Sequence, residues 1–374
     1  MTPKKRILIY RLGSLGDTII ALPCFHLIRE KYPDSGIVLL TNKPVASKAA
    51  PLEAILGNKT NYFYDKIINY PVGTRNPFLL LSIIIAIRVL RIDTLINITA
   101  ARSRKSSYRD KIFFRLAGIT TQIGFPENEE DYSALINPET GKYEWEAIRL
   151  SRRLKDLGEI NLDLDSYWDL RLTSEEIDKS RSLLADVQRD SKILVVSTGT
   201  KVQTNDWEAD NWNELLKRLG SRLTGWTLVV IGAEDEFDRA KQCLAAWPGK
   251  GVNLCGKSSP RVSAAVLKQA EIFIGHDSGP MHLASAVNTP VVAIFSSRAK
   301  PDQWYPRGKS NHIFYTMTDC AMCGLFVCIE QKKKCILSIT VSEVENKVLE
   351  LAGFNNVMSA QSNYTKTQLP MHNK

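Results

Sequence analysis

The stretch IYRLGSLGDTII, residues 9–20, joins one apolar run to another through a loop that holds two glycines and one carboxylate, Asp17. Such a sequence predicts a β-strand that turns tightly into a helix. The loop lacks the third glycine of a G-x-G-x-x-G dinucleotide fingerprint and the lysine of a G-x-x-x-x-G-K-[ST] phosphate loop. Two interpretations of Asp17 therefore stay open: it caps the helix, or it takes a proton from a ligand bound above the strand end.

Short apolar runs rich in Ile and Val alternate with segments of helical period along the chain. This alternation predicts an α/β fold with parallel sheets and crossover helices, and the continuously apolar runs indicate sheets covered on both faces. We expect strands at Ile7–Tyr10, Gly36–Leu40, Thr94–Ile98, Lys192–Ser197, Thr227–Ile231, Glu271–Ile274 and Val291–Phe295. We expect helices at Ile19–Lys31, Trp145–Leu157, Ser174–Val187, Trp212–Leu223 and Val262–Gln269.

The length of 374 residues favours two domains, at roughly 150 residues for each. The alternation of strands and helices is interrupted between residues 141 and 190, where two charged helical stretches flank INLDLDSYWDLRL. This interruption predicts a boundary near residue 170, with one βαβ domain over residues 1–170 and a second over 171–358. The polar, aperiodic end, residues 359–374, is predicted to be a disordered tail.

The formal net charge of +9 favours anionic partners without choosing among nucleotides, phosphorylated glycans, nucleic acid and an acidic membrane surface. The longest apolar run, FLLLSIIIAI at residues 78–87, is about half of the ~20 residues that a transmembrane helix needs. The basic start MTPKKRILIY is interrupted too early, by Arg11 and Asp17, for a signal peptide. We therefore expect a cytoplasmic protein.

A second loop lies in EIFIGHDSGPMHLASAVNTPVVAIF, residues 271–295, where HDSG follows a strand and a proline begins a helix. The free amides of Ser278 and Gly279, together with the helix dipole, would form an anion site suited to a diphosphate. Asp277 beside them can accept hydrogen bonds from sugar hydroxyls. In the alternative interpretation Asp277 or Ser278 caps the helix and His282 is a packed helix residue.

A third loop lies in VVSTGTKVQTNDWEADNW, residues 195–212. Here Lys201 either neutralises a phosphate or is a solvated surface lysine.

Together, the three loops resemble those of glycosyltransferase family 9, typified by the ADP-heptose:lipopolysaccharide heptosyltransferases. The resemblance runs from about Arg6 to Leu351 and includes RLGSLGDTIIALP and GHDSGPMHLASAVNTPVVAIF, with weaker echoes in LRIDTLINI, WTLVVIGAEDE and NLCGKSS. It implies a GT-B architecture, in which two Rossmann-like domains with parallel sheets face a central cleft. Residues 1–170 would then receive the acceptor and residues 171–358 the nucleotide sugar.

The resemblance also implies the reaction. It is an inverting, metal-independent transfer of heptose or a related sugar, with no cofactor, from a nucleotide-diphospho-sugar such as ADP-heptose. The acceptor is a lipopolysaccharide core or another surface glycan, which would bring the protein to the inner face of the inner membrane. Two other functions stay open: a GT-B isomerase of the nucleotide-sugar epimerase type, and a non-catalytic glycan- or nucleotide-binding protein.

Site residues follow from the resemblance position by position. Asp17 matches the acidic residue proposed as general base, and His282 matches the family's histidine. The predicted donor-binding set is Ser14, Gly16, Thr198, Lys201, Asp277, Ser278, Gly279, Met281 and His282. The family often has a lysine two residues before the Trp of the third loop, where this chain has Asn205. Either Lys201 supplies that charge, or the donor differs from ADP-heptose.

The basic run AARSRKSSYRDKIFFR, residues 100–115, follows a predicted strand on the acceptor side. It is either a solvated helix face or a surface that binds an acidic acceptor and an anionic membrane. The predicted acceptor-binding residues are Arg102, Arg104, Lys105 and Arg109. The run lacks the interleaved aromatics of single-strand nucleic-acid binding, so no nucleic acid is expected as a partner. An isomerase needs no large anionic acceptor, so this run favours a transferase.

The segment CAMCGLFVCIEQKKKC holds Cys320, Cys323, Cys328 and Cys335. The first pair has the spacing of zinc ligands but the second pair does not, so we favour structural thiols over a zinc site. The remaining cysteines, Cys24, Cys243 and Cys255, are predicted to be core thiols.

Overall fold

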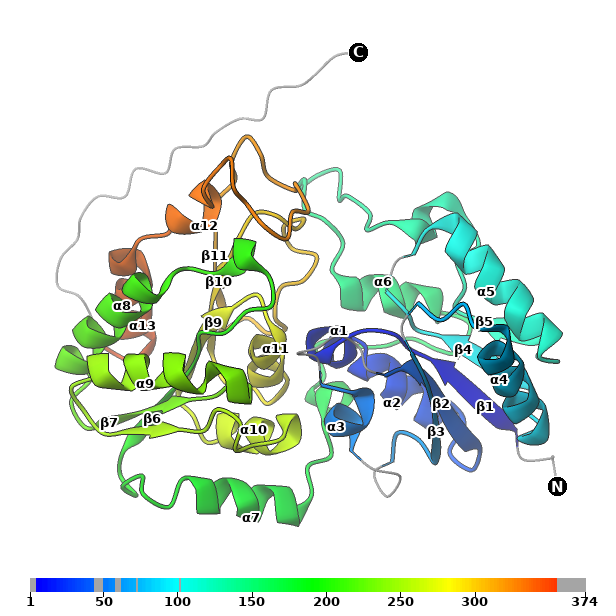
Figure 1. Cartoon of the computed structure of the whole chain (residues 1–374), viewed down its shortest axis with the longest axis horizontal. Coiled ribbons are helices and arrows are strands. Elements are labelled where there is room, and N and C mark those ends of the chain that lie inside the picture. The colour runs from blue at the N-terminus through cyan, green and yellow to red at the C-terminus, as the bar shows by residue number, and fades with distance from the viewer. Residues whose placement is uncertain (1–4, 44–49, 58–61, 72, 101, 355–374) are drawn as a thin grey trace.

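The computed structural model describes residues 5–43, 50–57, 62–71, 73–100 and 102–354, and it contains two parallel β-sheets (Figure 1). The first sheet has the order β3-β2-β1-β4-β5. Its strands are β1 (Arg6–Tyr10), β2 (Gly36–Asn42), β3 (Lys66–Tyr70), β4 (Thr94–Asn97) and β5 (Thr121–Ile123). This is the strand order of a Rossmann-like unit.

The second sheet has the order β11-β10-β9-β6-β7-β8, which is the same arrangement with one further strand. Its strands are β6 (Lys192–Ser197), β7 (Trp226–Val230), β8 (Gly251–Asn253), β9 (Ile272–His276), β10 (Val291–Phe295) and β11 (His312–Tyr315). Two Rossmann-like units with parallel sheets confirm the GT-B architecture that the sequence predicts.

Helices cover both faces of the first sheet because successive strand residues point to opposite faces. Ile7 and Ile9 of β1 pack toward helices α1 (Leu15–Ile20), α2 (Leu22–Lys31), α3 (Leu52–Leu56) and α6 (Glu146–Arg153). Leu8 and Tyr10 pack in a separate core with helices α4 (Pro77–Val89) and α5 (Arg104–Leu116). Strand β1 is therefore buried on both faces, as its continuous apolar run predicts.

The second sheet is covered in the same way. Helices α8 (Ala209–Arg222), α9 (Phe237–Ala246) and α13 (Val341–Leu351) pack on one face, near the short α12 (Lys334–Leu337). Helices α10 (Pro260–Leu267) and α11 (Gly279–Ala286) pack on the other face and belong to the same apolar core as α1 and α3. The molecule therefore has two halves, one around the first sheet and one around the second, and they share one continuous core.

The chain passes between the halves in the segment that the sequence analysis marks as a boundary. The short helix η2 (Asp165–Trp168) packs on α2 in the first half, whereas α7 (Ser174–Leu183) packs on α10 in the second. The side chain of Arg261 joins the halves, donating hydrogen bonds to the carbonyls of Leu170 at 2.8 Å and Ile55 at 3.2 Å. The division near residue 170 stays a prediction, and the predicted tail, residues 359–374, lies outside the described residues.

One expectation about helices needs correction, and another is confirmed. The predicted helix Ile19–Lys31 is two helices, α1 and α2, which meet at Ala21 just before the proline in the first turn of α2. The apolar run at residues 78–87 lies in α4, which is too short to cross a membrane. No helix in the described ranges is long and apolar enough to do so.

Candidate functional site

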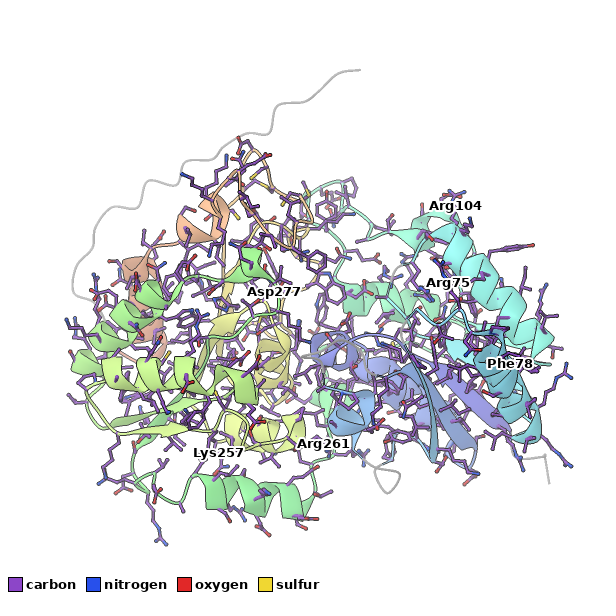
Figure 2. The ribbon with its side chains drawn as sticks, in the orientation of Figure 1. Arg75, Phe78, Arg104, Lys257, Arg261 and Asp277 are labelled. Atoms are coloured by element: carbon purple, nitrogen blue, oxygen red, sulfur yellow. The ribbon has the colours of Figure 1, made fainter. Side chains whose placement is uncertain are left out.

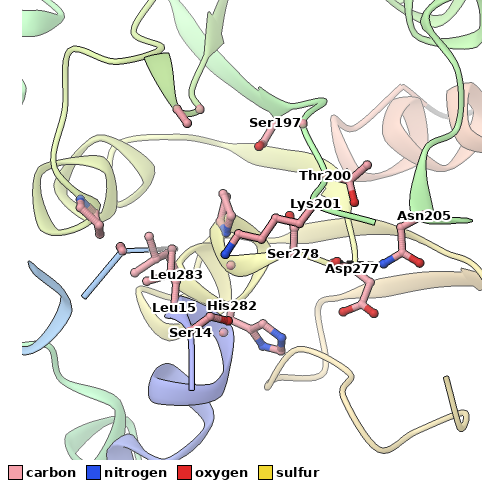
Figure 3. A pocket seen from close by; sticks show the side chains of 18 of the residues that line it. Ser14, Leu15, Ser197, Thr200, Lys201, Asn205, Asp277, Ser278, His282 and Leu283 are labelled. Carbon is pink, nitrogen blue, oxygen red and sulfur yellow. Dashed lines mark hydrogen bonds between the residues drawn. The ribbon is translucent and has the colours of Figure 1, made fainter. Parts of the chain in front are cut away.

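A cavity of about 660 Å³ lies between the two halves (Figure 3). It forms where the loops after β1, β6 and β9 meet, beside the points at which the order of strands reverses in each sheet. Ligands of open α/β sheets bind at such points. Its wall contains these predicted site residues: Ser14, Gly16, Asp17, Lys201, Asp277, Ser278, Gly279 and His282.

Asp17 has a structural role and also faces the cavity. Ser14 is the N-cap of α1, and the Asp17 carboxylate at the third helical position accepts hydrogen bonds from the Ser14 N–H and hydroxyl, both at 2.8 Å. Asp17 is therefore not the N-cap residue that one interpretation predicted but the second member of a capping box. Both hydrogen bonds given by the described residues fall on Oδ2, which leaves Oδ1 for a ligand.

The glycines of the two signature loops let the halves approach each other closely. A Cβ on Gly16 would lie 2.7 Å from Cδ2 of His282, and a Cβ on Gly279 would lie 2.6 Å from Cδ2 of Leu15. Helices α1 and α11 therefore pack directly, one from each half. In the same loop Gly13 has φ +140°, and a Cβ there would lie 2.6 Å from Cβ of Asp17. Gly16 and Gly279 therefore have this packing role in addition to their place in the cavity wall.

Burial changes the protonation of two groups on the second half's side of the cavity. It raises the pKa of Asp277 to about 7; Arg298 opposes this shift and the negative charge of Asp17 adds to it. Burial also lowers the pKa of His282 to about 4, so its imidazole is neutral at neutral pH. Two polar atoms here, His282 Nδ1 and Ser278 Oγ, are buried with no hydrogen-bond partner among the described residues.

Lys201 extends into the cavity (Figure 3). Burial lowers its pKa, while the nearby carboxylates of Asp17 and Glu236 oppose that shift. Asn205, which stands where the family often has lysine, is buried and holds the loops together. Its amide donates to the Asp277 carbonyl at 3.4 Å, and it accepts a hydrogen bond of 2.5 Å from the Ser296 hydroxyl. Of Lys201 and Asn205, only Lys201 therefore brings a positive charge to the cavity.

Two charged residues of the wall were missed in the sequence analysis. The Glu236 carboxylate lies over Gly199 and Gly232, so close that a Cβ on either glycine would meet it at 1.9 or 2.2 Å. Glu236 follows β7, the second strand of its unit, where an acidic residue binds ribose hydroxyls in dinucleotide folds. The sequence signal for Glu236 was the acidic run that follows this strand in WTLVVIGAEDE. Arg298 follows β10 and donates to the Leu325 carbonyl at 2.7 Å.

Other predicted residues lie away from the cavity wall. Thr198 and Met281 are buried and are not part of the wall, and Met281 belongs to the apolar core. None of the four predicted acceptor-binding residues, Arg102, Arg104, Lys105 and Arg109, lines the cavity. Arg102 and Arg109 both pair with Asp110, and Arg104 pairs with Glu129, whereas Lys105 is exposed. Their role in acceptor binding stays a prediction.

The cysteines do not form a metal site in the part of the chain that the structure describes. That part has no group of three or more His, Cys, Asp or Glu residues placed to hold a metal ion. Cys320, Cys323, Cys328 and Cys335 are free thiols on or near the surface. The other three cysteines are buried, as predicted for core thiols: Cys24, Cys243 and Cys255.

Two Rossmann-like units around one cavity define the GT-B class of fold. Within that class, the model of glycosyltransferase family 9 (heptosyltransferase) matches residues 98–334. The chain belongs to this family and is a glycosyltransferase.

Known lipopolysaccharide heptosyltransferases are similar in sequence to most of this chain. Lipopolysaccharide heptosyltransferase 3 of Escherichia coli K12 is 26% identical over 314 residues, covering 80% of this chain and 81% of that protein. Lipopolysaccharide core heptosyltransferase OpsX of Haemophilus influenzae is 22% identical over 308 residues, covering 78% and 79%.

Solved structures share the fold. The glycosyl transferase family 9 structure from Veillonella parvula aligns with a TM-score of 0.71 at 18% identity, covering 94% of this chain and 98% of that one. E. coli heptosyltransferase WaaC with ADP aligns with a TM-score of 0.59 at 16% identity, covering 92% and 99%.

Proposed function

We propose that this glycosyltransferase transfers heptose or a related sugar from a nucleotide-diphospho-sugar, such as ADP-heptose, to a lipopolysaccharide core or other surface glycan. The observation that carries the proposal is the cavity itself, in which Asp17 of the first half shares one space with Lys201 and Asp277 of the second. The names of the relatives support the choice of sugar and acceptor, and the solved WaaC structure contains ADP.

The donor would lie along the wall formed by the second half. Its diphosphate would accept hydrogen bonds from the N-terminus of α11, at Ser278 and Gly279, and would be neutralised by Lys201. The unpaired Ser278 Oγ supports this position because a buried hydroxyl needs a partner. Glu236 would accept from the ribose hydroxyls, and Asp277 would meet the hydroxyls of the transferred sugar.

The chemistry would proceed with inversion. The acceptor oxygen attacks the anomeric carbon on the face opposite the diphosphate, and the bond between that carbon and the diphosphate oxygen breaks. The electron pair of this bond goes to the diphosphate, where Lys201 and the α11 amides stabilise the new charge. The acceptor proton goes to Oδ1 of Asp17, the oxygen that the capping box leaves unused.

The acceptor would enter from the first half. The cationic residues at the start of α5 lie outside the cavity, so they would contact phosphates of an acceptor that extends beyond it. An acceptor anchored in lipid would also bring the enzyme into peripheral contact with an anionic membrane.

The test measures release of nucleoside diphosphate from ADP-heptose with and without a lipopolysaccharide core acceptor that lacks the added sugar. We expect release only with acceptor, and NMR of the product should show the opposite anomeric configuration to the donor. Conversion of the donor without acceptor would instead indicate an isomerase, and binding without turnover a non-catalytic protein. Retention of configuration would contradict the role of Asp17 as base.

A further inference from the structure

Helix α4 exposes large apolar side chains on the side where an ordinary surface helix carries polar residues. Ile83 and Ile87 are buried against the sheet, but Phe78 is 80% exposed and Val89 is 72% exposed. Between them Leu81 and Ile85 are also more than half exposed, at 51% and 52%. Residues spaced by three and four positions lie on one side of a helix, so these four form a single apolar stripe facing away from the core.

Helix α5 continues this surface. Tyr108, Ile112 and Leu116 are exposed with the same spacing, and the Arg88 side chain donates to the Leu116 carbonyl at 2.8 Å. The two helices thus lie side by side on the outer face of the first sheet (Figure 1). The α4–α5 face is defined by Phe78, Leu81, Ile85, Val89, Tyr108, Ile112 and Leu116.

The exposed charges of helices α4 and α5 themselves are of one sign. Exposed cations lie on and beside the two helices, namely Arg75, Arg88, Arg91, Lys105, Arg109 and Arg115. The exposed acids Asp93 and Glu129 lie beyond the helix ends, where Asp93 accepts from the Arg6 N–H and Glu129 pairs with Arg104. Helix α4 contains no Asp or Glu, and the only acid of α5, Asp110, is buried and paired with Arg102 and Arg109. A second copy of the chain docked here would bring two cationic rims together, which disfavours self-association.

We propose that the α4–α5 face docks on a lipid bilayer with anionic headgroups. The apolar stripe would enter the boundary between headgroups and acyl chains, and the surrounding Arg and Lys would contact lipid phosphates, as in interfacial helices. The proposal rests on the proposed function, because an acceptor anchored in lipid gives the enzyme a reason to dock. It differs from attachment by the basic run alone, since the apolar stripe adds a contact that salt does not screen.

The position of the face fits this role. Helices that follow parallel strands begin at the carboxyl ends of those strands, so α4 and α5 both begin on the side of the sheet that carries the cavity loops. Figure 2 shows Arg75, Phe78 and Arg104, which mark these beginnings, in the half of the molecule opposite to Asp277. Arg102, just before α5, donates to the hydroxyl of Tyr10 at 3.2 Å, and Tyr10 ends the strand whose loop carries Asp17. Docking would therefore hold the acceptor side of the cleft near the bilayer.

The experiment is co-sedimentation of the full chain with vesicles of phosphatidylglycerol and phosphatidylethanolamine, and with neutral phosphatidylcholine vesicles. The test variant combines Phe78→Gln, Leu81→Gln and Ile85→Gln, since glutamine keeps helix propensity. The matched control combines Met317→Gln, Val327→Gln and Ile329→Gln, which are 57%, 54% and 79% exposed in the other half. Thermal melting verifies that both variants fold.

We expect the unmodified chain to bind anionic vesicles and to keep part of that binding at 0.5 M salt. The test variant should bind at least tenfold more weakly and lose all binding at 0.5 M salt, while the control changes less than twofold. Equal binding by the test variant, or loss in the control variant only, would overturn the assignment. So would a dimer in vesicle-free solution that the test variant abolishes, because the face would then join two copies.

A separate assay keeps this inference distinct from the proposed function. Turnover on a soluble core oligosaccharide should be unchanged in the test variant, whereas turnover on acceptor embedded in vesicles should fall. Vesicle binding without any sugar transfer by the unmodified chain would overturn the proposed function and leave the docking surface standing.

Discussion

The two halves of the molecule have the same strand order but differ at their strand ends. The second half supplies most of the cavity wall and places Asp277 and His282 where burial shifts their pKa values to about 7 and about 4. The first half supplies little more than the loop of Ser14 and Asp17. Its distinctive surface is instead the cationic, apolar α4–α5 face. The same kind of unit therefore supplies a wall of buried polar groups for a small ligand in one half and an open side for a large ligand in the other.

Removing the proposed general base, Asp17 of the first half, should have the largest effect on turnover. Asp17→Asn keeps an oxygen that can accept from the Ser14 N–H and hydroxyl, so the capping box survives while basicity is lost. We expect kcat to fall by ~10² to 10⁴, with little change in melting temperature or donor affinity. Steady-state kinetics, calorimetry and thermal melting measure the three quantities. Turnover within about threefold of the unmodified enzyme, well short of that range, would place the base elsewhere.

In the cavity wall of the second half, loss of the Asp277 carboxyl should have the largest effect on donor binding. Asp277→Ala should weaken binding of the nucleotide-sugar by ~10- to 100-fold, the worth of a hydrogen bond to a charged or buried group. Binding of the free nucleoside diphosphate should change much less, because the diphosphate would rest on Ser278, Gly279 and Lys201. Titration calorimetry with both ligands measures the difference. Equal losses for the two ligands would mean that Asp277 does not contact the transferred sugar.

The central strands could be predicted from sequence, and the edge strands could not. All seven predicted strands exist, and each is an inner strand of its sheet: β1, β2, β4, β6, β7, β9 and β10. The four missed strands, β3, β5, β8 and β11, are the outermost ones. An inner strand is covered on both faces and reads as a continuous apolar run, whereas an edge strand is short and partly exposed. For example, β3 is KIINY, in which no residue is fully buried.

The site shows a similar limit. The loops after the central strands were predictable because ligands of such sheets bind at the strand ends, and eight predicted residues do line the cavity. The packing role of Gly16 and Gly279 was not predictable, since it depends on contacts between α1 and α11, far apart in sequence. Similarly, spacing alone could not reveal that Arg102 and Arg109 share the buried Asp110.

The close contact between the halves can be tested at Gly16. An alanine in a helix would ordinarily add about 1 kcal/mol of stability, but here its Cβ would lie 2.7 Å from the His282 ring. Overpacking costs about 1–3 kcal/mol and the helix-propensity gain offsets part of it, so we expect Gly16→Ala to lower the free energy of unfolding by about 1 kcal/mol. Gly36→Ala is the matched control, because a Cβ there meets nothing within 4 Å. Urea denaturation measures both, and a Gly16→Ala variant as stable as the control would show that α1 and α11 separate without cost.

The smallest expected effect is the dependence of stability on pH at Asp277. Its pKa in the folded protein, about 7, is above the usual 3.8, so the unfolded chain loses this proton near pH 4 and the folded chain keeps it until near pH 7. Asp277 therefore destabilises the fold progressively as pH rises from 4 to 7, and the penalty is complete above pH 7.

Asp277→Asn removes that penalty, so its stability relative to the unmodified chain should rise between pH 5 and pH 8. A shift of about three pKa units sets a ceiling of about 4 kcal/mol, and we expect about 1 kcal/mol because the cavity admits water. Asp165→Asn is a control without pH dependence in this range, since hydrogen bonds from Arg307 and Asn288 lower the pKa of Asp165 and keep it ionised in the folded chain. That variant should be less stable than the unmodified chain by the same amount at pH 5 and at pH 8. If the relative stability of Asp277→Asn were as constant between pH 5 and pH 8 as that of Asp165→Asn, Asp277 would be solvated like an ordinary surface carboxylate, and the contrast between a buried wall and an open side would fail at its most direct point.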